Sequence, residues 1–139
     1  MAGLLTHLSI GIIGFLIIYF TFYKSEPKDK IIYGAIFILS NILPDFVDFG
    51  VLSIKMGSLN PDKILTNPLF QTLELLGHTS SNWIILVLIV ISIAWLLYEL
   101  RKISKKTFIT VIISAILLLI GVIIHSKLDL LVIEKNHWI

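Results

Sequence analysis

The chain has 139 residues, of which 57% are hydrophobic and 14% are charged, and its formal net charge is +2. A soluble domain is nearer one quarter charged, so this composition predicts a single integral membrane domain over residues 1–139. The small net charge argues against a nucleic-acid partner. The absence of cysteine excludes disulfides and thiolate metal ligands.

The first apolar run, residues 3–23, contains no Lys, Arg, Asp or Glu. It is long enough to cross a hydrocarbon core of about 30 Å, and it lacks the basic start of a signal peptide, so we interpret it as a retained first helix. A polar turn follows at residues 24–30, where Pro27 is suited to begin the next helix. The second run, residues 31–43, is short for a span and is interrupted by Pro44.

Residues 50–77 mix polar and apolar side chains. In each of the pairs Asn60-Pro61 and Asn67-Pro68, asparagine is typical of a helix N-cap and proline of the first helical position. Gly77 is a candidate helix stop. This segment predicts one or two short helices that lie at the membrane surface or form a lid.

Two further apolar runs occupy residues 75–98 and 107–124, and a basic turn at residues 101–106 joins them. The predicted fold is therefore an all-α integral membrane bundle of four transmembrane helices. Short interfacial helices are expected between helices two and three.

The basic residues indicate a topology. Seven of the eleven Lys and Arg residues fall in the first and third connections, at Lys24, Lys28, Lys30, Arg101, Lys102, Lys105 and Lys106. Short loops rich in Lys and Arg stay in the cytoplasm. This rule predicts a multi-pass protein of the cell membrane with both termini and residues 50–77 on the extracytoplasmic side.

The rare ionisable residues of the apolar runs all fall at that predicted outer end. His7 and His78 would start helices one and three, whereas the others would end helices two and four; the full set is His7, Asp45, Asp48, His78, His125 and Asp129. A carboxylate at membrane depth costs several kcal/mol unless it is paired, protonated or bound to metal. The shared placement therefore predicts a functional site.

The spacing within this set favours a metal site. His125 and Asp129 are four residues apart and share one helix face, and Asp45 and Asp48 are three residues apart. Neutral imidazoles and ionised carboxylates are the ligand forms that a divalent cation needs. Without cysteine, the set suits one or two ions, with zinc favoured and manganese or iron as alternatives.

Further candidates surround the predicted ligands. Asp48 and Glu74 are the candidate catalytic residues, although Asp48 alone could be a helix cap and Glu74 could be a ligand, a general base or a surface residue. Thr79, Ser80 and Ser81 most simply cap helix three, although the hydroxyl groups of Thr79 and Ser80 are also candidates to contact a substrate. Glu134 and His137 in the tail are weaker candidates to complete the site.

Four motifs, taken together, resemble the YdjM-type family of membrane-bound metal-dependent hydrolases, and more distantly the all-helical zinc-dependent phospholipase C group. They are Thr6-His7-Leu8-Ser9-Ile10-Gly11, Leu43-Pro44-Asp45-Phe46-Val47-Asp48, Gly77-His78-Thr79-Ser80 and His125-Ser126-Lys127-Leu128-Asp129. The resemblance implies the same six His and Asp residues as metal-binding positions and a phosphoester as the target. Family members often carry a His-Arg pair where this chain has Leu73 and Glu74.

The leading hypothesis is a membrane-embedded metal-dependent hydrolase that cleaves a phosphoester in a lipid or lipid-linked substrate, using metal-activated water at the outer membrane face. A first alternative is a non-catalytic metal-binding membrane protein, either a sensor or a transport component. A second is a structural partner protein whose polar residues only pair with one another. Oligomerisation is left open.

Overall fold

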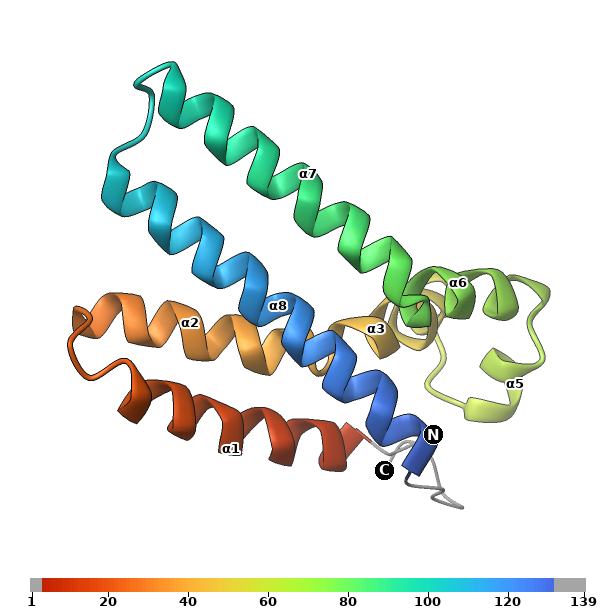
Figure 1. Ribbon diagram of the computed structural model, residues 1–139. Helices are drawn as coiled ribbons and strands as arrows, with labels where there is room; N and C mark the ends of the chain where they lie inside the picture. The colour runs from red at the N-terminus through yellow and green to blue at the C-terminus, as the bar shows by residue number, and fades with distance from the viewer. Residues whose placement is uncertain (1–3, 132–139) are drawn as a thin grey trace.

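The computed structural model describes residues 4–131, and all their regular elements are helical (Figure 1). This confirms the predicted all-α class for that part of the chain. The elements are α1 (Leu4–Thr21), α2 (Pro27–Ser40), α3 (Leu43–Asp45), the π-helical turn η1 (Phe46–Gly50), α4 (Val51–Met56), α5 (Pro61–Leu65), α6 (Pro68–His78), α7 (Ser80–Glu99) and α8 (Lys105–Leu131).

The four long helices are α1, α2, α7 and α8, and the main contacts run from α1 to α2, from α2 to α8 and from α8 to α7. Figure 1 shows α8 between α2 and α7, with the short helices α3 to α6 gathered where α2 and α8 end and α7 begins. The elements that carry the predicted site residues therefore meet at one end of the molecule.

Apolar composition makes some of these helices candidates for membrane spans. Helices α7 and α8 are long and apolar enough to cross a membrane, and a third span exists if the bent pair Pro27–Ser40 and Leu43–Met56 counts as one. Large apolar side chains on α7 are exposed, as lipid-facing residues are, including Leu88 and Ile89. Two or three spans are consistent with a membrane protein, while a fourth span through α1 stays a prediction.

The chain bends sharply after α2. The helix ends at Ser40, Pro44 lies in the first turn of α3, and the two halves of the bent pair meet at 51°. Proline cannot donate a backbone hydrogen bond and clashes with the preceding turn, which accounts for the break. The expectation that Asp45 and Asp48 end helix two is therefore corrected, because they lie beyond the bend, in α3 and η1.

The structure confirms both predicted asparagine caps in the segment between residues 50 and 77. The Asn60 side-chain oxygen accepts a hydrogen bond from the backbone N–H of Asp62 at 3.0 Å, and Asn67 accepts one from Leu69 at 2.9 Å. Beneath these caps, α4, α5 and α6 enclose a small apolar core of Phe49, Leu52, Ile64 and Phe70. This core holds the segment against η1.

Gly77 does not stop a helix, and His78 does not begin one. Helix α6 continues to His78, the chain turns at Thr79, and α7 starts at Ser80. A Cβ atom on Gly77 would lie 2.6 Å from the carbonyl oxygen of Pro44, so only glycine allows α6 to approach α3 this closely. That approach places His78 beside the acidic residues after the bend.

Candidate metal centre

The structure brings together all six predicted His and Asp residues, which come from five elements. Helix α1 supplies His7, α3 supplies Asp45, η1 supplies Asp48, α6 supplies His78, and α8 supplies His125 and Asp129. The side chains of His7, Asp48 and His125 are 0% exposed and that of Asp45 is 2% exposed. The centre is thus a buried polar cluster at the end of an apolar helix bundle.

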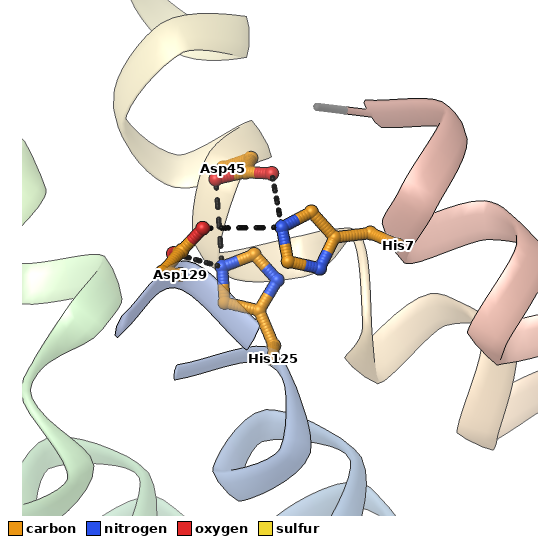
Figure 2. A group of neighbouring side chains, drawn as sticks. All are labelled: His7, Asp45, His125 and Asp129. Carbon is orange, nitrogen blue, oxygen red and sulfur yellow. Dashed lines mark hydrogen bonds and ion pairs between the residues drawn. The ribbon is translucent and has the colours of Figure 1, made fainter. Parts of the chain in front are cut away.

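Four of these residues surround one point. Ligand atoms of His7, Asp45, His125 and Asp129 all lie within 4.8 Å of one another. Figure 2 shows the two imidazole rings and the two carboxylates directed toward the same space. The Asp129 oxygens lie 3.3 Å from His7 Nε2 and 3.2 Å from His125 Nε2, and the Asp45 oxygens lie 3.8 Å and 3.4 Å from the same two nitrogens.

This geometry fits a divalent cation. Ligands bound tetrahedrally at the usual zinc distances of about 2.0–2.2 Å are separated from each other by roughly 3.3–3.6 Å. The observed separations between nitrogen and oxygen are close to that range. Both oxygens of the buried Asp45 carboxylate lack a hydrogen-bond partner among the described residues. A buried carboxylate is costly unless its charge is paired, and a cation at this point would lower that cost.

His78 approaches the same point from the more exposed side. Its Nε2 lies 3.2 Å from Asp129 Oδ2, 3.4 Å from Asp45 Oδ1 and 3.2 Å from His125 Nε2. Burial alone would lower the pKa of His78, but the contacts with Asp129, Asp45 and Asp48 raise that pKa to about 11. The cluster therefore carries an excess of negative charge that attracts positive charge.

Two outer contacts orient the imidazoles. His125 Nδ1 donates a hydrogen bond to the backbone carbonyl of Asn41 at 2.9 Å. In the neutral imidazole this places the proton on Nδ1, so the lone pair of Nε2 points toward the centre. His78 Nδ1 lies 3.3 Å from Asp48 Oδ2, while Asp48 Oδ1 accepts a hydrogen bond from the backbone N–H of Phe49. Such outer partners fix the orientation of a metal-binding histidine. Asp48 thus lies behind His78, and its predicted roles as a direct ligand and as a catalytic residue stay predictions.

A cavity of about 440 Å³ adjoins the centre. Its lining residues are Glu74, His78, Ser80, Ile123, Ser126, Lys127, Asp129 and Leu130. The candidate residues Glu74 and Ser80 are therefore next to the centre, whereas Thr79 does not line the cavity. Thr79 occupies the N-cap position of α7, but its side chain makes no capping hydrogen bond, so the predicted cap by Thr79 is corrected.

Sequence reasoning missed some of the residues at the site. The Asn41 carbonyl could not be singled out, because every residue has a backbone carbonyl. Lys127 had a signal, since it lies between His125 and Asp129 near the end of an otherwise apolar helix. Glu134 and His137, the weaker candidates in the tail, lie outside the described residues.

No protein-family model matches the chain, and neither a curated protein nor a solved structure matches it.

Proposed function

We propose that this protein is a metal-dependent membrane hydrolase that cleaves a phosphoester in a lipid or lipid-linked substrate. The observation that carries the proposal is the convergence of four ligand groups within 4.8 Å of one another, one of which is the buried Asp45 carboxylate, faced by three imidazole groups. His7, Asp45, His125 and Asp129 would hold one divalent ion, with zinc favoured by the mixed nitrogen and oxygen donors. A second ion is not required by this arrangement.

A bound divalent ion lowers the pKa of water and polarises a phosphoryl oxygen. The protein contributes the remaining requirements. The contacts of His125 with Asn41 and of His78 with Asp48 direct both imidazoles toward the centre. Glu74 lines the adjoining cavity with a partly buried carboxylate, which is suited to accept a proton there.

Two features support a lipid rather than a water-soluble substrate. The cavity lies near the ends of α7 and α8, the helices that could cross a membrane, and exposed Ile123 and Leu130 form part of its wall. The order of His and Asp motifs that resembles the YdjM-type hydrolases also supports the proposal. The proposal includes four spans, with the centre on the extracytoplasmic side, where the basic loops are absent.

Elemental analysis of the detergent-purified protein is the first test. We expect one or two equivalents of zinc, manganese or iron, and we expect Asp45→Asn to lose the metal because the substitution removes a buried charge at the centre. Asp62→Asn is the control, since Asp62 is exposed on α5. Absence of metal from the wild type after reloading with zinc, manganese and iron would contradict the proposal.

A screen of phospholipid and isoprenoid-phosphate substrates then tests hydrolysis. We expect turnover by the metal-loaded wild type and by Asp62→Asn, and none by Asp45→Asn. Bound metal without hydrolysis of any phosphoester would instead favour the non-catalytic metal protein.

A further inference from the structure

The cavity beside the metal centre is where a ligand would reach it. Among the six clustered side chains, only His78 and Asp129 exceed 10% exposure, at 17% and 11%. Both of them line this cavity, whereas His7 and His125 are fully buried. A molecule that approaches the centre therefore contacts the wall formed by α6, the start of α7 and the end of α8.

This wall carries a lysine side chain that is not paired with a described acidic residue. Lys127 is exposed on α8 and forms no ion pair with any described residue. Across the cavity from α8, Ser80 is the first residue of α7, and the Thr79 side chain leaves the start of that helix uncapped. Free N–H groups and the dipole at a helix start attract anions and add to the lysine charge.

Negative groups on the same wall oppose the attraction of Lys127 and of the start of α7 for an anion. Glu74 and Asp129 also line the cavity, so an anion is repelled there unless the centre holds a cation. A divalent ion at the centre would offset two of the three carboxylate charges and would offer an anion a direct partner, and Lys127 adds a positive group on the same cavity. The two together suit a phosphate group, whose oxygens accept from several donors at once.

We propose that this cavity binds the phosphate group of the substrate and that Lys127 is the positioning residue that recognises it. The inference rests on the proposed function and adds the place where the phosphate group binds and the residue that recognises it. The exposed side chains of Ile123 and Leu130 line the same cavity and would contact an alkyl chain attached to the phosphate. An alkyl phosphate should therefore bind more tightly than inorganic phosphate.

The test measures binding of inorganic phosphate and of hexyl phosphate to the zinc-loaded, detergent-purified protein by titration calorimetry. Lys127→Met should weaken both probes about tenfold, the order expected for loss of one charged hydrogen bond. Lys127→Arg should restore most of the affinity. Lys63→Met is the matched control, because Lys63 is an exposed lysine on α5 away from the cavity, and it should bind both probes as the wild type does.

Equal affinity of Lys127→Met and the wild type for both probes would overturn the inference, and so would failure of the zinc-loaded wild type to bind either probe. Zinc content, measured on the same samples, separates this result from failure of the proposed metal site. Phosphate binding that depends on Lys127, without any hydrolysis, would support the inference while refuting the hydrolase. Tighter binding of hexyl phosphate indicates a lipid-like source for the phosphate, and equal binding indicates a free one.

Discussion

Helices α2 and α8 bring acidic residues together near both of their ends, but the two regions are satisfied differently. At the connection between α1 and α2, Glu26 forms an ion pair with Lys106 at the start of α8, and Lys106 Nζ is 3.7 Å from Asp29. At the other end, the ion-pair partners of Asp45 among the described residues are all imidazole groups. The first region pairs its acidic residues with lysine, whereas the second pairs Asp45 with histidine among the described residues.

Lysine accounts for the charge balance of the first region, since the exposed Glu26 and the buried Asp29 both lie within ion-pair distance of Lys106. Glu26 is solvent-exposed, and the hydrogen bonds from Lys106 and Lys28 lower its pKa below the ordinary value of 4.5. Exposed ion pairs of this kind contribute little to stability, because water screens them. The ion pairs of Glu26 are therefore ordinary surface interactions of a loop.

The second region differs in the cations that its buried acids contact. Three carboxylates and three imidazoles are packed where water is largely excluded, and no described Lys or Arg pairs with them. Buried carboxylates must be paired, protonated or bound to metal. The comparison teaches that burial without a described Lys or Arg partner, rather than the number of acids, distinguishes the end that carries the candidate metal centre.

Asp48→Asn should produce the largest of the effects that sharpen this comparison. The substitution keeps the shape of the side chain but removes the charge beside His78 Nδ1, and loss of such an outer partner typically lowers metal affinity about 10- to 100-fold. Competition with a chelator of known zinc affinity measures the change, with Asp62→Asn as the control. Complete loss of metal would show that Asp48 is a direct ligand, and unchanged affinity would contradict its role as an outer partner.

Gly121→Ala tests whether close packing of α2 and α8 supports the centre. The added methyl group would lie 1.7 Å from Ser40 Oγ and 2.8 Å from Ser40 Cβ, so the helices must separate. Overpacking of this kind costs about 1–3 kcal/mol, and His125 one turn later should bind metal more weakly. The free energy of unfolding in mixed micelles and the zinc affinity measure the two effects.

Gly57→Ala is the matched control for that experiment. Gly57 has φ of +60° and nothing within 4 Å of an added Cβ, so the substitution adds backbone strain of about 1 kcal/mol without steric contact. Its zinc affinity should equal that of the wild type. If Gly121→Ala behaved like Gly57→Ala in both measurements, packing against Ser40 would not position the centre.

Glu26→Gln should have the smallest effect. Because the folded-state pKa of Glu26 is lowered, its stabilising contribution is present above pH 4.5 and is lost as the pH falls through the lowered folded-state value. The variant should therefore unfold at a slightly lower temperature than the wild type at pH 7, and the difference should shrink in acid and in high salt. A large, salt-independent loss at pH 7 would contradict the contrast between the two regions.

Much of the candidate centre could be predicted because ionisable residues are rare in apolar helices. The basic loops and the order of the apolar runs placed His7, Asp45, His78 and His125 at one end of the predicted helices, and the structure brings them together. The path of the chain around Pro44 could not be predicted in the same way. Proline indicates a break, but the angle of 51° and the π-helical turn that follows depend on packing against α6.

The sequence by itself determined the helical class, the apolar character of the long helices and the set of six polar residues, because hydropathy and residue spacing are local properties. Only the tertiary structure decided which of the six surround one point, that Asp48 lies behind His78, and that the Asn41 carbonyl orients His125. It also decided that Lys127 lines the cavity beside them. These relations join residues up to 122 positions apart, and the distances between helices depend on side-chain packing, which no local pattern encodes.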